Sequence, residues 1–165
     1  MILLDAILRS AINPALTLLP AKMDSDRARV EILAVGLQES GLTKRYQVVH
    51  GDPYAKGPAR GLWQNERGGL QCVMTNPATR EHALVLCAAR KCPFDVPQVH
   101  ASLEYDDILA AGLARLFLWA DPKPLPDLDD AKAAWETYLR CWNPGKPRPA
   151  EWPANHAAAR AQVLS

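Results

Sequence analysis

The sequence lacks any apolar run long enough to cross a bilayer. Its two most apolar stretches, residues 2–12 and 108–120, are interrupted by Asp5, Arg9 and Arg115, whereas a membrane-spanning helix needs about 20 apolar residues. An acidic residue also stands near the N-terminus, where a signal peptide would carry basic ones. We therefore expect no membrane span and no signal peptide.

Cysteine is scarce, and neither sign of charge is in excess. The chain has four cysteines in 165 residues, and no two of them form a Cys-x-x-Cys pair, so a disulfide scaffold is not expected. The four histidines are dispersed and make no metal-ligand pair with each other or with cysteine. A net charge of +1 supplies no general attraction for nucleic acid. The sequence thus predicts free thiols, no metal, no cofactor and no nucleic-acid partner.

What the sequence does contain is helical periodicity. Hydrophobic residues make up 48% of the chain, which is enough for one sizeable core, and no run alternates with the period of a strand. We expect an all-α fold in a single domain, residues 1–165, with a Pro-rich C-terminal extension from about residue 143. The expected helices cover residues 3–12, 15–19, 26–40, 77–90, 106–120, 127–142 and 153–164.

The helix at residues 26–40 has clear end signals. Asp24 or Ser25 can cap its N-terminus, and Gly41 can adopt the left-handed conformation that ends a helix. Its C-terminal half is apolar nearly all round, so the helix belongs in the core. Glu39 lies in its last turn, directly before a Gly- and Pro-rich segment, residues 43–69, that shows no periodicity. Long irregular segments inside a compact domain tend to carry function.

Two effects act on the carboxyl group of Glu39 in the same direction. Burial disfavours the charged form, and the negative end of the helix dipole disfavours it again. A glutamic acid that keeps its proton near neutral pH can act as a general acid toward a glycosidic oxygen. The structural alternative is an ion pair between Glu39 and Arg45 or Arg60.

A second motif, Gly61-Leu62-Trp63-Gln64, lies within the irregular segment. Gly61 permits a tight turn, and the apolar side chains of Leu62 and Trp63 can pack the segment onto the core. Gln64 offers both a donor and an acceptor to a sugar. The other tryptophans lie at helical spacing and are expected in the core, whereas Trp63 is the one expected to reach a sugar ring.

Glu39-Ser40 at a helix end, followed by Gly61-Leu62-Trp63-Gln64, resembles the lysozyme-like superfamily, nearest to lytic transglycosylases and goose-type lysozymes. The wider sequence resembles small proteins encoded by tailed bacteriophages. The resemblance implies a lysozyme-like helical domain with a long irregular active-site loop. It implies that Glu39 protonates the oxygen between N-acetylmuramic acid and N-acetylglucosamine in peptidoglycan, and that Ser40 helps to position the substrate. Gly61, Leu62, Trp63 and Gln64 would shape the cleft, and Tyr138 would match a tyrosine that faces the catalytic acid in the family.

Several alternatives stay open at this point. Asp52 and Glu66 are candidates for a second carboxylate, whose distance from Glu39 would decide between retaining, inverting and transglycosylase-like outcomes. A lytic transglycosylase needs no second carboxylate, and the single strong glutamate favours that version. The expected partners are the glycan strand and other phage virion proteins, with synthesis in the bacterial cytoplasm and incorporation into a particle. The competing function is a virion structural or assembly protein on the same fold without activity.

Overall fold

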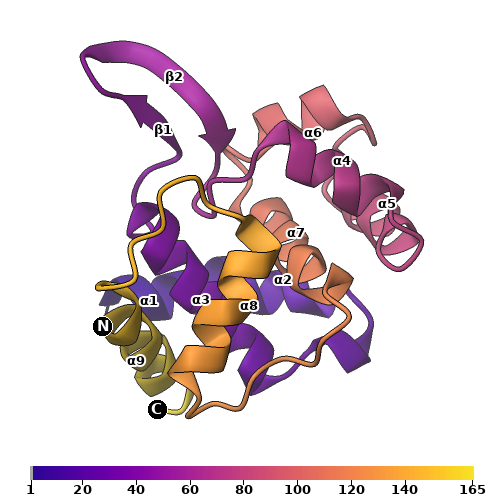
Figure 1. Ribbon diagram of the computed structural model, residues 1–165. Helices are drawn as coiled ribbons and strands as arrows, with labels where there is room; N and C mark the ends of the chain where they lie inside the picture. Colours follow the sequence, from indigo (N-terminus) through magenta and orange to yellow (C-terminus); the bar gives the residue numbers. More distant parts are fainter. Residues whose placement is uncertain (1) are drawn as a thin grey trace.

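The computed structural model describes residues 2–165, so Met1 of the expected domain lies outside the described residues. The chain is mostly helical, as expected, and also contains a two-stranded antiparallel sheet (Figure 1). In chain order the elements are α1 (Ile2–Ile7), the π-helical turn η1 (Leu8–Ile12), α2 (Asn13–Thr17), the 3₁₀ turn η2 (Ala21–Met23), α3 (Asp26–Ser40), β1 (Tyr46–Val49), β2 (Asp52–Arg60), α4 (Arg67–Thr75), α5 (Arg80–Ala89), α6 (Val96–Ser102), α7 (Asp107–Ala120), α8 (Ala131–Trp142) and α9 (Trp152–Val163).

Helix α3 matches the predicted boundaries. The side chain of Ser25 accepts a hydrogen bond from the backbone N–H of Ala28, so Ser25 is the N-cap. Gly41 has a φ of 64° and ends the helix in the left-handed conformation. Leu42 then folds back, with its N–H donating to the carbonyl of Gly36, and its side chain is buried. This end geometry fixes the position of Glu39 relative to the core.

The segment expected to be irregular contains a β-hairpin, so the all-α prediction needs correction. Strands β1 and β2 pair with irregular register, and Val49 lies opposite Asp52 across the turn. Most of β1 is exposed on both faces, and such a strand lacks the alternation of buried and polar residues by which strands are recognised. The two strands were therefore not predicted, because their sequence carries no hydrophobic alternation.

The first helix is not interrupted where an interruption was expected. At Asn13-Pro14 the chain passes from the π-helical turn η1 directly into α2. Pro14 lies in the first turn of α2, where a missing N–H group leaves no hydrogen bond unmade.

The later helices differ in part from the expected ones. Helices α4 and α6 were not predicted, and α5 and α8 begin three and four residues later than expected. Asp130 caps α8 by accepting from the N–H of Ala133.

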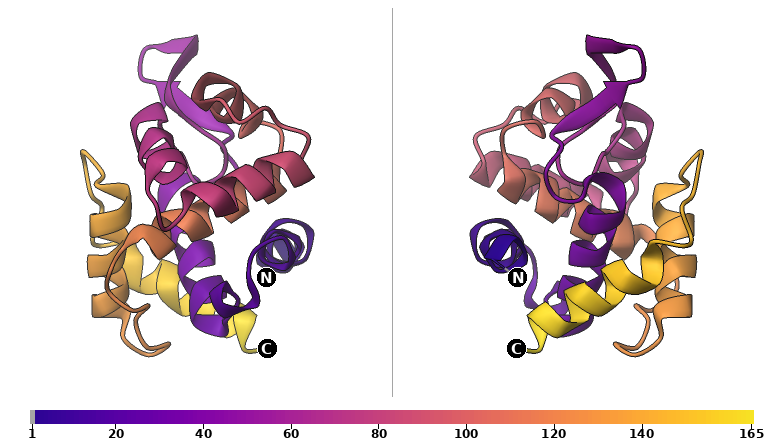
Figure 2. Two further views of the ribbon diagram at one scale, coloured as in Figure 1. Left: turned by 90° about the vertical axis from the view of Figure 1, so that its right-hand side faces the viewer. Right: turned by 90° about the vertical axis from the view of Figure 1, so that its left-hand side faces the viewer.

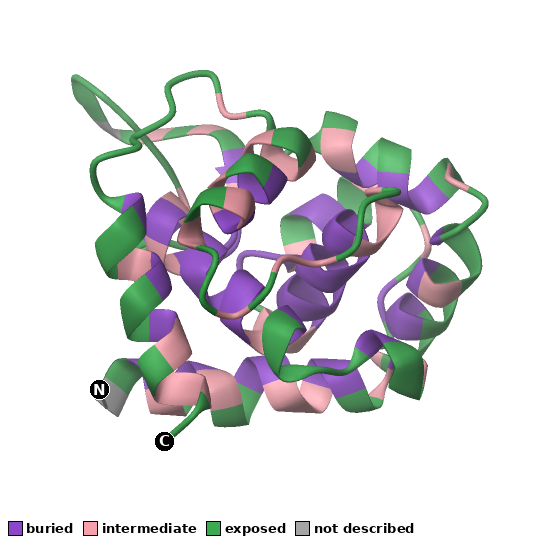
Figure 3. Cartoon of the chain, turned by 60° about the horizontal axis from the view of Figure 1, so that its bottom comes forward, coloured by how far each residue is buried: buried purple, intermediate pink, exposed green. Residues whose placement is uncertain are grey.

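The elements form two lobes on either side of α7 (Figures 1 and 2). The hairpin lobe comprises β1, β2 and α4–α6, and the helical lobe comprises α1–α3, α8 and α9. Helix α7 contacts both lobes, and its residues from Leu109 to Leu118 are buried. Figure 3 shows buried residues in the middle of the molecule and exposed ones over the hairpin. Among residues 2–165, every helix is too short or too polar to cross a bilayer.

The Pro-rich segment after residue 143 does not extend away from the domain. Helix α9 packs along α3, and the buried Trp152 at its start donates a hydrogen bond to the carbonyl of Ala131. The connection between α8 and α9, residues 143–151, passes the C-terminal end of α3 (Figure 1). The C-terminal part of the chain is therefore a component of the helical lobe.

Candidate functional site

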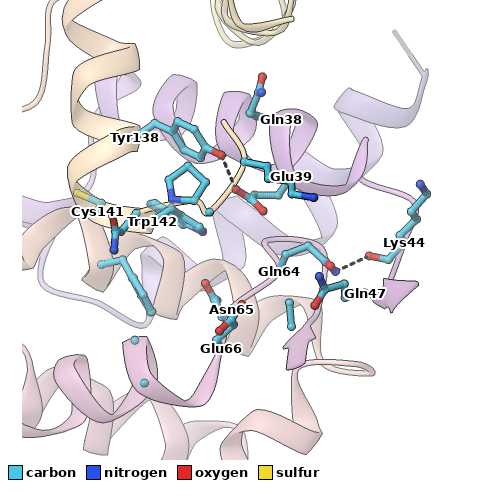
Figure 4. Close-up of a pocket in the computed structure, with 18 of the residues that line it drawn as sticks. Gln38, Glu39, Lys44, Gln47, Gln64, Asn65, Glu66, Tyr138, Cys141 and Trp142 are labelled. Atoms are coloured by element: carbon cyan, nitrogen blue, oxygen red, sulfur yellow. Dashed lines mark hydrogen bonds between the residues drawn. The ribbon is translucent and has the colours of Figure 1, made fainter. Parts of the chain in front are cut away.

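Residues from both lobes line one pocket with a volume of about 940 Å³. The helical lobe contributes the end of α3, the end of α8 and residues 143–148, and the hairpin lobe contributes β1, residues 64–66 and the start of α4. The pocket therefore lies where the two lobes face each other. Figure 4 shows Glu39, Gln64, Glu66, Tyr138 and Trp142 around this space.

Glu39 and Tyr138 meet at this pocket, as the resemblance implied. The hydroxyl of Tyr138 donates a hydrogen bond to Oε1 of Glu39 at 2.7 Å. Tyr138 is buried and stacks on Trp152, with ring centroids 5.3 Å apart. Aromatic packing therefore holds the tyrosine in place, and the tyrosine in turn orients the carboxyl group of Glu39.

Burial raises the pKa of Glu39 above its ordinary value. The hydrogen bond from Tyr138 and the positive charge of Arg148 act in the opposite direction, whereas the nearby carboxylate of Glu66 raises the pKa further. The group is half-buried and lines the pocket. Glu39 is therefore a proton donor candidate that a ligand can reach.

Arg148 connects the pocket wall to the end of α3. Its guanidinium donates to the backbone carbonyl of Gln38, and the side chain of Gln38 donates to the carbonyl of Arg148 at 3.0 Å. Asn155 of α9 donates to the side chain of Gln38 at 2.9 Å. These bonds fasten the connection between α8 and α9 beside Glu39, and they bring a positive charge next to it.

The two arginines considered as partners of Glu39 are engaged elsewhere. Arg45 forms a bidentate pair with Asp107, in which Nη2 lies 2.8 Å from Oδ2. Arg60 lies 3.6 Å from a carboxylate oxygen of Glu104. The ion-pair alternative for Glu39 therefore does not hold with either residue.

Ser40 lies behind the pocket wall and not in it. Its hydroxyl donates to the carbonyl of Leu62 at 2.6 Å and accepts from the N–H of Leu42 at 3.1 Å. Gly61, with a φ of 75°, and the buried Leu62 form the turn that this hydroxyl holds against α3. Ser40, Gly61 and Leu62 were expected to bind the substrate, but they do not line the pocket. The hydroxyl of Ser40 instead joins the two motifs by its hydrogen bond to Leu62.

The tryptophan that lines the pocket is Trp142 and not Trp63. Trp63 is fully buried, and its indole donates to the carbonyl of Ile32 at 2.7 Å, so its ring cannot reach a sugar. Trp142 lines the pocket and donates to the carbonyl of Trp63 at 2.9 Å. Trp63 was expected at a sugar ring and Trp142 in the core, and the structure places them the other way round. Helical spacing alone does not tell which face of α8 is buried.

Gln64 is the residue of the second motif that lines the pocket. Its backbone adopts a φ of 49°, and its side-chain amide donates to the carbonyl of Gly61 at 2.8 Å. Asn65 follows it, lines the same pocket and was not predicted. Its position directly after the motif was the available sequence signal, whereas no signal pointed to Arg148 or Trp142.

One of the two candidate second carboxylates lies at the pocket. Glu66 lines it and acts on the pKa of Glu39. Asp52 lies at the hairpin turn, where its Oδ1 accepts from the N–H groups of Tyr54 and Ala55, and it does not line the pocket. A second carboxylate for this site is therefore Glu66.

Within residues 2–165, no three His, Cys, Asp or Glu side chains gather as a metal ion would require. All four cysteines, Cys72, Cys87, Cys92 and Cys141, are free thiols. Comparisons with family models, with curated proteins and with solved structures return no match. The functional conclusion therefore depends on the chemistry of the pocket itself.

Proposed function

We propose that this protein binds a peptidoglycan glycan strand in the pocket and cleaves its glycosidic bond, with Glu39 as the general acid. The observation that carries the proposal is a half-buried carboxyl group with a raised pKa, oriented by Tyr138 at the wall of an open pocket. Proton donation to a leaving oxygen needs an acid that is protonated near neutral pH and reachable by substrate. The resemblance of Glu39-Ser40 and Gly61–Gln64 to lysozyme-like proteins supports the same substrate.

The remaining pocket residues suit a sugar chain. Trp142 and Phe117 offer aromatic surface, which packs against the apolar faces of sugar rings. The side-chain oxygen of Gln64 and the amide group of Asn65 can serve sugar hydroxyls and acetamides. Glu66 can act as a second carboxylate, and a lytic transglycosylase reaction would proceed without it.

Zymography on purified cell walls tests the proposal. Wild-type protein should clear the walls, Glu39→Gln should not, and Glu136→Gln, which alters an exposed residue of α8, should clear them like wild type. Mass spectrometry of the fragments would distinguish anhydro-ended from reducing-ended products. Equal clearing by wild type and Glu39→Gln would reject Glu39 as the acid.

A second candidate function, a phage virion structural or assembly protein, is favoured by one feature of the hairpin. Val48, Val49 and Tyr54 expose apolar surface there, and Tyr54 is 93% exposed, as expected for a protein-contact surface. Light scattering tests this function. Self-association of wild type that Tyr54→Ser abolishes, together with absent wall clearing, would favour assembly over catalysis.

A further inference from the structure

The side chain of Asn65 is buried at the pocket without any hydrogen bond. The residue is 2% exposed, and neither its Nδ2 nor its Oδ1 has a partner in the part of the chain that the structure describes. Its backbone is fully engaged, because Asn65 and Arg60 exchange two N–H···O bonds of 2.9 and 3.0 Å. The backbone therefore holds the residue in place while its amide group stays unpaired.

An unpaired buried amide opposes folding, since it has lost water and gained no partner. Such groups are rare in native proteins, and each calls for an explanation. Asn65 lines the pocket that contains Glu39 and Gln64, and Figure 4 shows it beside Glu66, across the pocket from Glu39. A ligand in this pocket is the partner that the fold itself does not supply.

The neighbouring polar groups are already committed to the fold. The hydroxyl of Ser40 is engaged by Leu62 and Leu42, and the amide nitrogen of Gln64 donates to two backbone carbonyls, at 2.8 and 3.3 Å. Asn65 is the side chain of this turn that keeps both a donor and an acceptor free. Asn65, and not Ser40, therefore has the side chain with which this turn can position a substrate.

We propose that Asn65 recognises the acetamido group of an N-acetylhexosamine unit in the bound glycan, an inference that rests on the proposed function. Nδ2 donates to the acetamido carbonyl and Oδ1 accepts from a hydroxyl of the same glycan, because the N–H of a trans acetamido group points away from its carbonyl. Both atoms are shielded in this conformation, so binding requires the side chain to rotate toward the pocket. A sugar whose amine is protonated lacks the acetamido carbonyl and offers no acceptor to Nδ2 at that position, so it is bound less tightly.

The test measures binding without turnover, in the Glu39→Gln background. Isothermal titration calorimetry compares a β-1,4-linked N-acetylglucosamine tetramer with the matching glucosamine tetramer. Glu39→Gln should bind the acetylated tetramer about tenfold more tightly. Adding Asn65→Leu, which keeps the approximate size and removes the amide, should bring this ratio close to one. Adding Gln71→Leu, which removes an exposed amide from α4 outside the pocket, should leave the ratio unchanged.

A thermal melt separates recognition from a structural role. Because the Asn65 amide has no partner in the fold, Asn65→Leu should keep or raise the melting temperature. A lower melting temperature, an unchanged binding ratio, or equal or undetectable binding of both tetramers by Glu39→Gln would overturn the inference. The proposed function fails on a different result, namely absent wall clearing by wild type while acetamido discrimination persists.

Discussion

The hydroxyl of Tyr138 donates a hydrogen bond to Oε1 of Glu39 at 2.7 Å, joining residues 99 positions apart. Burial, and then the hydrogen bond to Glu39, raises the pKa of Tyr138, so the phenol stays protonated and remains a donor. A donor of this kind stabilises the carboxylate form of Glu39 and opposes the effect of burial. The pKa of Glu39 therefore reflects a balance that one substitution can change.

Replacing Tyr138 with Phe should raise the pKa of Glu39. The substitution removes a hydrogen bond that favours the charged form and leaves the carboxyl group buried. If cleavage requires protonated Glu39, the loss of activity at high pH should move to higher pH in Tyr138→Phe. NMR titration of the Glu39 carboxyl carbon and the pH dependence of wall clearing measure the two effects. Tyr54→Phe, at a residue that is 93% exposed, is the control, and a lower Glu39 pKa in Tyr138→Phe would contradict the explanation.

Ser40→Ala should act on stability and not on substrate affinity. The serine hydroxyl bonds the buried carbonyl of Leu62 and the N–H of Leu42, and leaving buried groups unpaired costs about 1–3 kcal/mol. Urea denaturation should show this loss, and Ser10→Ala, whose exposed hydroxyl bonds the carbonyl of Ala6, should change stability by less than about 0.5 kcal/mol. A weakened affinity for glycan with unchanged stability would instead place Ser40 in contact with substrate.

Gly61→Ala should destabilise the turn that carries Gln64 and Asn65. Gly61 has a φ of 75°, and a Cβ atom there would lie 2.8 Å from the carbonyl oxygen of Leu103. The left-handed conformation alone costs a non-glycine residue about 1–2 kcal/mol, and the close contact adds to this cost. Gly68→Ala, in α4 with open space around the added methyl group, should be neutral or stabilising. Thermal melts compare the two variants, and equal melting temperatures would show that the turn accommodates the added methyl group without cost.

Local signals allowed part of the fold and site to be predicted. The cap at Ser25 and the left-handed Gly41 are encoded within a few residues, and so the end of α3 and the position of Glu39 could be predicted. The hairpin could not, because β1 is exposed on both faces and its pairing with β2 leaves no hydrophobic pattern. Sequence patterns thus identified most of the long helices and missed the hairpin, which buries neither face, together with the short helices α4 and α6.

The far side of the pocket depends on contacts between distant parts of the chain. Arg148 meets Gln38 from 110 positions away, and nothing local to residues 144–149 indicates this. Trp63 and Trp142 were assigned opposite environments from those they occupy, because a tryptophan has the same local signature in a core and at a pocket. Contacts with other elements decide between these environments, because the Trp63 indole bonds the carbonyl of Ile32 in α3 and Trp142 packs on Phe117 of α7.

Glu31→Gln should stabilise the protein at neutral pH. Glu31 lies in the middle of α3, is 1% exposed, and its Oε1 has no hydrogen-bond partner within residues 2–165. Burial raises its pKa well above the ordinary value, and the positive charge of Arg140 opposes this only in part. As the pH rises past the ordinary pKa of glutamic acid, the unfolded chain releases this proton while the folded chain keeps it. Folding therefore loses stability up to the folded-state pKa.

The glutamine variant carries no such proton, so its advantage over wild type should be present at pH 7 and disappear below the ordinary pKa of glutamic acid. Urea denaturation of both proteins at pH 4 and pH 7 measures the free energy of unfolding in each case. Glu136→Gln changes the same side chain at an exposed position of α8 and should show no comparable gain. A Glu31→Gln protein that is less stable than wild type at pH 7 would contradict this explanation.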